Sequence, residues 1–321
     1  MNKSTKIWLI IAASLILIGS IIFGGVMTML KWDFKKLSTV KYETSNYEID
    51  DEYLNISITS DTADIKFLPS ENSKTSVECY EPQNARHWVT VEDNTLIIKS
   101  IDKRKWYEYI GINIGTPKIT LSIPQGELGK LTVESDTGDI TIPKEYKFES
   151  IDISEHTGYV KNYASATDSI KIKASTGNIK LENITANSLD LSVSTGKISA
   201  SSVKCDGDIN ISTSTGKTEL SDITCQNLTS KGSTGRALLK NVISAEKLTL
   251  KRSTGDINLD KSDAKDILIE TDTGDVTGSL LSEKIFFAQS DTGKINLPKT
   301  VNGGRCEIAT DTGDIELYIV E

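Results

Sequence analysis

Short runs of alternating apolar and polar residues fill most of the chain, and they recur with a constant period. The dipeptide Thr-Gly marks this period, because ten of its copies follow one another at spacings of 19 or 20 residues. The threonines of these copies are Thr137, Thr157, Thr176, Thr195, Thr215, Thr234, Thr254, Thr273, Thr292 and Thr312. A period of this length indicates stacked units, none of which can bury its apolar face alone.

The residues that flank each Thr-Gly predict two strands joined by a turn. Apolar residues stand six and four positions before the threonine, as Ile151 and Ile153 do. Others stand three and five positions after it, as Ile179 and Leu181 do. A period of two predicts strands with one apolar face. The glycine between them predicts a tight turn, because glycine adopts a positive φ at little steric cost.

The constant spacing favours the coils of a solenoid over a meander of hairpins, because stacking in register places every Thr-Gly in one column. Neighbouring coils lie about 4.8 Å apart, so ten coils would form a rod of about 48 Å. Proline cannot donate to a strand ladder, and only Pro143 and Pro298 fall within the repeats. We therefore predict an all-β parallel β-solenoid of ten 19–20-residue coils over residues 126–321.

Residues 46–125 keep the strand texture but lose the period. Residues 60–65 (SDTADI) look like a decayed repeat with Ala in place of Gly, and residues 88–101 predict two strands around Asp93-Asn94. A solenoid needs an atypical unit to cover its first coil. We predict that residues 46–125 form an N-terminal β cap and that residues 31–45 are a short juxtamembrane linker.

An uncharged apolar block occupies residues 7–30, after a tail of residues 1–6. It exceeds the roughly 20 residues that a helix needs to cross a bilayer. Trp8 and Trp32 stand at its two ends, where indole rings favour the membrane interface. The block is too long for the core of a signal peptide, and no A-x-A cleavage triplet follows it. We predict an uncleaved transmembrane helix that binds the plasma membrane through residues 7–30.

Charge counting leaves the orientation of this helix open. Two lysines precede the span and four follow it closely, which by the positive-inside rule alone would keep the large part in the cytoplasm. The chain carries a net charge of −9, and removing the two N-terminal lysines leaves −11 for the rest. An acidic balance of this size excludes nucleic acid as the partner, since phosphate binding needs a basic face.

The anchor, the proline-bounded strand at residues 117–124 (PKITLSIP) and the run LTVESDTGDITI with its echoes resemble the bacterial "putative adhesin" family. This family is a β-strand-repeat domain of unknown function. The likeness is greatest to its membrane-anchored members, which are encoded beside envelope-stress regulators in Gram-positive bacteria. It covers about residues 46–321, and S-x-T-G-[DKN]-I is its most specific motif. The resemblance implies a β-solenoid outside the plasma membrane, with no catalytic residues to assign.

Aspartates recur in two columns beside the Thr-Gly turns of the last repeats. Asp272, Asp291 and Asp311 precede the threonine. Asp275 and Asp314 follow the glycine, with Lys294 between them in the sequence. Stacked carboxylates about 4.8 Å apart could hold Ca²⁺, which takes six to eight oxygen ligands. The nine-residue signature of calcium-binding rolls is absent, so we favour a solvated turn and predict no metal site.

Lys197, Lys217 and Arg236 follow the glycine in three successive repeats. A ridge of like charges is unfavourable between stacked strands, although lysine on an exposed edge also deters strand pairing. We favour a solvated ridge over contact with an anionic cell-wall polymer or lipid headgroups.

The remaining chemistry-bearing residues give no motif. Cys205 and Cys225 fall in one column of adjacent coils, at disulfide distance, but that column otherwise holds small residues, so we favour unpaired thiols. Cys306 takes an inward position, as a small hydrophobe does. His87 and His156 lie in different segments, and no metalloprotease, nucleophile-elbow or P-loop spacing occurs. We therefore predict no catalytic residue, no cofactor and no enzyme activity.

These observations predict a single-pass plasma-membrane protein with an extracellular C-terminal solenoid. Its expected role is non-catalytic surface binding, adhesin-like or associated with envelope stress, with a cell-wall polymer or an envelope protein as partner. The alternatives are a self-associating scaffold and, more remotely, an envelope glycan-active enzyme. Self-association would use the edge of the C-terminal coil, which Asp311, Asp314, Glu316 and Glu321 would otherwise guard by repulsion.

Overall fold

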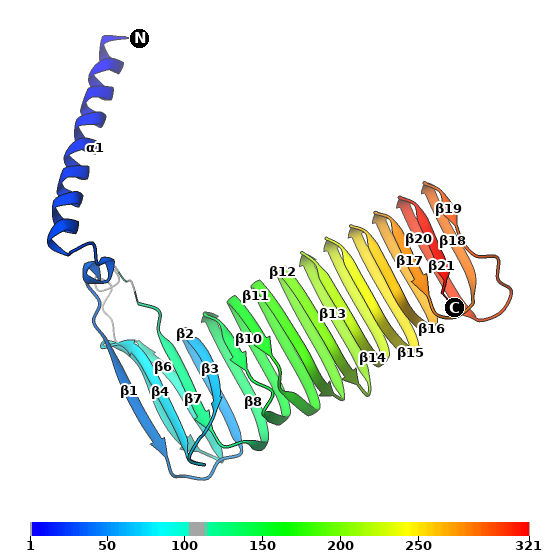
Figure 1. Ribbon diagram of the computed structural model, residues 1–321, viewed down its shortest axis with the longest axis horizontal. Helices are drawn as coiled ribbons and strands as arrows, with labels where there is room; N and C mark the ends of the chain where they lie inside the picture. The colour runs from blue at the N-terminus through cyan, green and yellow to red at the C-terminus, as the bar shows by residue number, and fades with distance from the viewer. Residues whose placement is uncertain (1, 103–112, 114, 321) are drawn as a thin grey trace.

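The apolar segment at the N-terminus is helical, and the rest of the chain is almost entirely β-structure (Figure 1). The computed structural model describes residues 2–102, 113 and 115–320. Helix α1 (Lys3–Met29) is followed by the short 3₁₀ helix η1 (Phe34–Leu37) and then by strand β1, which begins at Tyr42 inside the predicted linker. The apolar side chains of α1 are exposed except that of Met27, and the helix is long and apolar enough to cross a membrane.

The strands divide into a cap and a stack of coils, all hydrogen-bonded in one sheet. The cap strands are β1 (Tyr42–Ile49), β4 (Thr75–Pro82), β5 (Ala85–Glu92), β6 (Thr95–Asp102) and β7 (Lys118–Ile123). The strands of the coils are β2 (Asn55–Thr62), β3 (Asp64–Pro69), β8 (Gly126–Thr137), β9 (Ile140–Ile142), β10 (Tyr146–Asn162), β11 (Ser165–Ala186), β12 (Ser188–Cys205), β13 (Asp208–Thr215), β14 (Thr218–Thr234), β15 (Ala237–Thr254), β16 (Ile257–Thr273), β17 (Val276–Leu280), β18 (Lys284–Thr292), β19 (Ile295–Asn296), β20 (Gly304–Thr312) and β21 (Ile315–Ile319).

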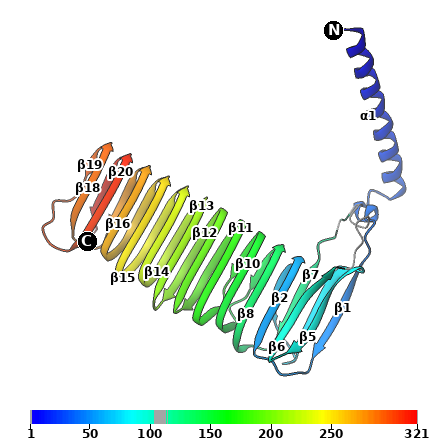
Figure 2. The ribbon, with the colours of Figure 1, turned by 180° about the vertical axis from the view of Figure 1, so that it is seen from behind.

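The coils stack in parallel and in register, which confirms the predicted β-solenoid (Figures 1 and 2). Each repeat threonine is the ladder partner of a threonine in the next coil, as Thr176 is of Thr157 and of Thr195. The apolar positions stack in the same way. Ile172 and Leu191 are partners, and neither is exposed to solvent. Each such side chain contributes about 1.5–3 kcal/mol of burial free energy.

The first coil of the stack comes from the decayed repeat. Strands β2 and β3 pair in parallel with β8 and β9, so that Thr62 is the ladder partner of Thr137, 75 positions later in the chain. On its other side this coil pairs with the cap strands β6 and β7. Strands β5, β4 and β1 then continue the sheet with antiparallel pairings. The predicted hairpin is present in β5 and β6, and both turn residues, Asp93 and Asn94, have positive φ.

At the other end, the order of the coils differs from the order of the chain. Strand β20 pairs with β16 on one side and with β18 on the other, so that Thr312 lies between Thr273 and Thr292. The outermost coil is therefore β18–β19, as both views show. Our prediction that Asp311, Asp314 and Glu316 guard the exposed edge is wrong for this reason, because their coil is paired on both sides. Glu321 lies outside the described residues.

The corner at each Thr-Gly requires glycine for two separate reasons. Eight of the ten repeat glycines have φ between 126° and 154°, a region that residues with a Cβ rarely adopt. In addition, a Cβ on Gly196 would overlap the carbonyl oxygen of Gly177 in the neighbouring coil. The same overlap recurs from coil to coil, so the glycine carries both the turn and the close approach of two backbones.

Each coil has two further corners, seven and ten residues after the repeat threonine. Our prediction treated this part of the repeat as a return loop without corners. Seven residues after the threonine, a column of residues takes the left-handed conformation without glycine: Asn183, Ser202, Asp222, Asn241 and Lys261. Ten residues after the threonine, small side chains face the third corner. Ser244 Oγ there lies 2.9 Å from the Lys247 carbonyl oxygen, and Cys205 Sγ lies 3.3 Å from that of Asn187.

Candidate functional site

The outer surface beside the Thr-Gly corner carries charge in straight columns. Lys197, Lys217 and Arg236 follow the glycine in three coils whose threonines are ladder partners, so the predicted basic ridge is present. Lys197 also forms an ion pair with Glu219, while Lys217 and Arg236 are exposed. The ridge therefore presents positive charge on three successive coils of an acidic protein.

The aspartates that follow the glycine have a structural task at the corner. The backbone N–H of Asp314 donates to Asp275 Oδ1 at 2.8 Å, and that of Lys294 donates to Asp314 Oδ1 at 2.7 Å. At the other end of the stack, the N–H of Asp139 donates to Asp64 Oδ1 in the same way. Each carboxylate thus accepts a backbone hydrogen bond from the next coil, and Asp314, not Lys294, is the neighbour of Asp275.

The aspartate columns do not assemble a set of metal ligands. Asp272, Asp311 and Asp291 lie in three successive coils and are exposed. Within residues 2–102, 113 and 115–320, the one group of three Cys, His, Asp or Glu side chains with ligand atoms within 4.8 Å of one another lies elsewhere, in the cap.

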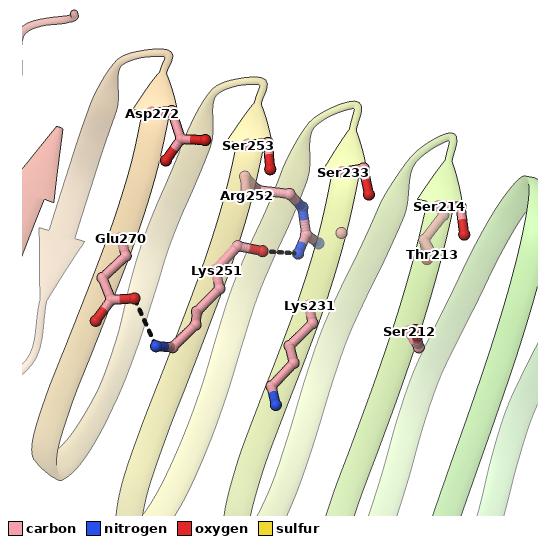
Figure 3. A pocket seen from close by; sticks show the side chains of 11 residues that line it. Ser212, Thr213, Ser214, Lys231, Ser233, Lys251, Arg252, Ser253, Glu270 and Asp272 are labelled. Carbon is pink, nitrogen blue, oxygen red and sulfur yellow. Dashed lines mark hydrogen bonds and ion pairs between the residues drawn. The ribbon is translucent and has the colours of Figure 1, made fainter. Parts of the chain in front are cut away.

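A shallow groove of about 330 Å³ lies on the corner face around Arg252 (Figure 3). The Arg252 side chain is only 4% exposed. Its guanidinium donates to the backbone oxygens of Lys251 at 2.7 Å and of Ser230 at 3.2 Å, and to the hydroxyls of Ser230 and Thr218. Burial lowers its pKa to about 10.

The Arg252 side chain has room because its ladder partner in the preceding coil is a glycine, Gly232. A Cβ on Gly232 would lie 3.1 Å from Cδ and from Cζ of Arg252. Beside it, the exposed side chains of Lys251 and Glu270 form an ion pair. Since all four hydrogen bonds of the guanidinium end on neutral oxygens, Arg252 joins neighbouring strands from inside the rod.

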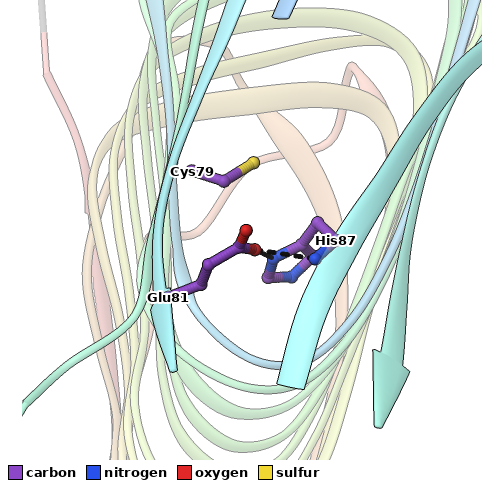
Figure 4. A group of neighbouring side chains, drawn as sticks. All are labelled: Cys79, Glu81 and His87. Carbon is purple, nitrogen blue, oxygen red and sulfur yellow. Dashed lines mark hydrogen bonds and ion pairs between the residues drawn. The ribbon is translucent and has the colours of Figure 1, made fainter. Parts of the chain in front are cut away.

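The second candidate is a buried cluster in the cap, formed by Cys79, Glu81 and His87 (Figure 4). Alternation along β4 turns Cys79 and Glu81 inward, and neither is exposed to solvent. His87 is 6% exposed and points at them from β5. Its Nδ1 lies 2.8 Å from Glu81 Oε2, and its backbone N–H donates to the same oxygen at 2.7 Å.

Hydrogen bonds keep the buried carboxyl group of this cluster ionised. Burial by itself would raise the pKa of Glu81, but hydrogen bonds from the ring and backbone of His87 and from Ser45 outweigh it and hold the pKa below its usual value. Burial raises the pKa of the Cys79 thiol to about 12, and the negative charge of Glu81 adds to that effect. The cluster therefore holds a carboxylate beside a protonated thiol.

The polar row continues from the cap into the first coils. Ser60 Oγ lies 3.4 Å from His87 Nε2. Ser135 is the ladder partner of Ser60, and Glu155 is the ladder partner of Ser135. Ser60, His87 and Glu81 thus follow the order of a hydrolase triad. Ser60 is only 3% exposed and faces the interior, so this hydroxyl does not meet a substrate.

Glu155 ends this row as a second buried carboxyl group. It is 2% exposed, and its Oε1 accepts the N–H of Thr157 at 3.1 Å. Its Oε2 and the hydroxyl of Ser135 have no hydrogen-bond partner among the described residues. Burial raises the pKa of Glu155 to about 7.

The structure separates the residues that the sequence singled out. His156 lies exposed at a turn, 3.5 Å from Asp136, as predicted, whereas His87 is buried in the cap cluster. The four cysteines Cys79, Cys205, Cys225 and Cys306 are buried free thiols. Sequence reasoning missed Cys79 and Glu81, although their alternate positions on one strand mark them as inward-facing.

Comparison with known proteins places this geometry in context. The Toastrack DUF4097 family matches residues 53–213 and 204–321. No curated protein matches the chain. A crystal structure of a putative adhesin from Parabacteroides distasonis aligns at 11% identity and a TM-score of 0.46, covering 88% of this chain and 98% of its own. A putative lipid binding protein from the same organism aligns at 18% identity and 0.48, covering 76% and 98%. A putative adhesin from Parabacteroides merdae aligns at 14% identity and 0.47, with the same coverage.

Proposed function

The chain belongs to the Toastrack DUF4097 family, and on that premise we propose that it is a membrane-anchored, non-catalytic binding protein that displays its solenoid on the outer side of the plasma membrane. The proposed ligand is an anionic polymer of the cell wall. The observation that carries this proposal is the basic ridge of Lys197, Lys217 and Arg236.

Helix α1 supports the anchor. Apart from Met27 near its end, its apolar side chains have little protein cover: Ile10, Leu15 and Ile16 are 65–70% exposed. A helix of 27 residues is about 40 Å long, and the hydrocarbon core of a bilayer is about 30 Å thick. A lipid bilayer therefore supplies the apolar surroundings that this helix lacks in the protein.

The ridge supports the choice of ligand. In-register coils repeat a charge every 4.8 Å or so along the rod, which suits a polymer with regularly spaced anionic groups. The chain as a whole is acidic, with a net charge of −9, and the ridge places three basic side chains side by side on it. Binding of this kind weakens as salt screens the charges.

The test compares two triple variants of the full chain in detergent. The first carries Lys197→Glu, Lys217→Glu and Arg236→Glu. The control carries Lys173→Glu, Lys204→Glu and Lys240→Glu, which changes the net charge equally at exposed positions in the same part of the rod. We expect the ridge variant to lose at least tenfold in retention by isolated cell walls at low salt, while the control variant is retained as the natural chain is. Equal retention of both variants would overturn the proposal.

A second candidate function, self-association, rests on the outermost coil. Within the described part of the chain, β18 and β19 pair on one side only, with β20 and β21. Ile295 in this coil is 47% exposed, whereas its ladder partner Ile315 is fully buried. The rod therefore ends in an uncovered apolar face with a free strand edge, which a second copy could extend.

Sedimentation of the full chain over a range of concentrations tests this candidate. Self-association through the end coil predicts assemblies that grow with concentration and that Ile295→Lys abolishes. If Ile295→Lys sediments as the natural chain does, this end is not the contact.

A further inference from the structure

We propose that Cys79, Glu81 and His87 form a zinc site inside the cap. The three side chains offer a thiol, a carboxylate and an imidazole, and these are the ligand types that Zn²⁺ takes in proteins. Their ligand atoms already lie within 4.8 Å of one another. They converge from two strands, with Cys79 and Glu81 on β4 and His87 facing them from β5 (Figure 4).

The distances leave little movement for the site to close. Bonds of about 2.0–2.3 Å place the ligand atoms of a tetrahedral zinc ion roughly 3.3–3.8 Å apart. The ligand atoms of the cluster all lie within 4.8 Å of one another, and Nδ1 of His87 and Oε2 of Glu81 are 2.8 Å apart. Each separation therefore differs from that range by at most about 1 Å.

Neighbouring groups hold the ligands in the orientation that a metal needs. Ser45 Oγ donates to Glu81 Oε1 at 2.9 Å, which leaves Oε2 on the side of the histidine. Ser60 Oγ lies 3.4 Å from Nε2 of His87, so that Nδ1 is the nitrogen turned toward Glu81 and the metal position. Metal-bound histidines and carboxylates regularly carry such outer hydrogen bonds, which fix the ring and tune the ligand.

A cation would give these residues a common role. Hydrogen bonds from His87 and Ser45 already offset the cost of burying the Glu81 carboxylate, and a metal ion would bring the Cys79 thiol into the same set of ligands. A zinc ion would bind the carboxylate and convert the thiol to a thiolate. The column of Cys205 and Cys225 otherwise holds small residues, and Cys306 lies near the buried ion pair of Lys284 and Asp263. Among the described residues, Cys79 is the cysteine that belongs to a group of three possible metal ligands.

The surroundings of His87 leave room for a fourth ligand. His87 lines a cavity of about 80 Å³ together with Asp61, Ser100 and Asn113. Such a cavity has room for water. Three protein ligands and one water complete the tetrahedral coordination that zinc prefers.

Cobalt(II) provides the direct test, because it occupies zinc sites and shows a thiolate-to-cobalt charge-transfer absorption. Metal-depleted full chain in detergent is titrated with Co²⁺ and then with Zn²⁺, alongside Cys79→Ser, Glu81→Gln and Cys225→Ser variants. We expect one equivalent of Co²⁺ with the thiolate absorption in the natural chain and in Cys225→Ser, and displacement by Zn²⁺. Cys79→Ser should lose the absorption, and Glu81→Gln should weaken binding at least tenfold.

Circular dichroism of each metal-depleted variant separates loss of binding from loss of fold. If Cys79→Ser does not fold, the Glu81→Gln titration decides by itself, because that side chain keeps the shape of the natural one. Absence of stoichiometric Co²⁺ binding by the natural chain, or an absorption that survives in Cys79→Ser, would overturn the site. None of these variants touches the basic ridge or the end coil.

Discussion

The middle coils of the solenoid and the N-terminal cap bury different kinds of side chain. Between Thr157 and Thr215 the interior holds a stack of aliphatic residues, in which Ile172, Leu191 and Ile211 lie one above another. In the cap, a carboxylate and an imidazole are buried as deeply as the aliphatic residues.

The difference follows from how the strands meet. In the middle, most inward side chains lie between two copies of their own position, so that aliphatic residues stack on aliphatic residues; Arg252 is buried there only because its ladder neighbours are Gly232 and Thr271. In the cap, side chains from β4 and β5 point at one another, so that unlike residues meet and form hydrogen bonds. Regular stacking therefore favours a uniform core, and the irregular end can hold a polar site.

The sharpest test of the regular middle is a side chain at the glycine corner. We expect Gly196→Ala to cost more than about 4 kcal/mol of unfolding free energy, because a strained φ adds to the overlap with the Gly177 carbonyl. The matched control is Gly126→Ala, where φ is also positive but a Cβ meets no atom within 4 Å. Strain alone at that control site costs about 1–3 kcal/mol. Equal losses in denaturant titrations would show that backbone contact between coils contributes nothing.

Truncating an inward apolar side chain should cost more stability in the middle coils than at the C-terminal end. Leu191→Ala removes a fully buried side chain and should lower the free energy of unfolding by about 2–5 kcal/mol. Ile295 lies at an inward position of the outermost coil but is 47% exposed. Ile295→Ala should therefore lower the free energy of unfolding by less than about 1.5 kcal/mol. Similar costs in urea unfolding would mean that another surface covers the end coil.

Glu155 should make the first coils sensitive to pH. Its pKa is raised from 4.5 to about 7 in the folded protein, so the folded state favours the protonated form. Stability is then full below pH 4.5, falls as pH rises towards 7 and stays low above it. The loss reaches about 3 kcal/mol. Glu155→Gln should remove this loss, and a pH series of melting temperatures that is identical for the two proteins would contradict the assignment.

The smallest expected effect compares two neighbouring residues of the middle coils, the buried Arg252 and the exposed Lys251. Arg252→Lys cannot reproduce four hydrogen bonds from a planar guanidinium and should cost about 1–3 kcal/mol. The neighbouring Lys251→Ala breaks an exposed ion pair with Glu270 and should change stability by less than about 0.5 kcal/mol. Denaturant titrations measure both, and a larger loss for Lys251→Ala would reverse the roles assigned to the two side chains.

Much of the rod could be predicted because its determinants are local. Alternation around Ile151 and Ile179 marked the strands, and the decayed repeat at residues 60–65 was recognisable from its likeness to the others. The corner at Asn183 and Asp222 was missed, although asparagine and aspartate are the residues that best tolerate its left-handed conformation. The cap cluster was missed because Glu81 and His87 lie outside the repeats, on two different strands, so the spacing of residues in the sequence does not reveal that they meet.

The coil, its strands, its glycine corner and the apolar helix can be predicted from the amino-acid sequence, since each depends on residues within about one period. The order of coils at the two ends depends on long-range pairing and emerges only from the folded chain. A parallel ladder offers the same hydrogen bonds to any coil of matching period, so Thr62 can meet Thr137, and Thr312 can meet Thr273. Pro298 follows the two-residue strand β19 and cannot donate to a ladder. The coil that contains Pro298 lies outermost, where one side needs no partner.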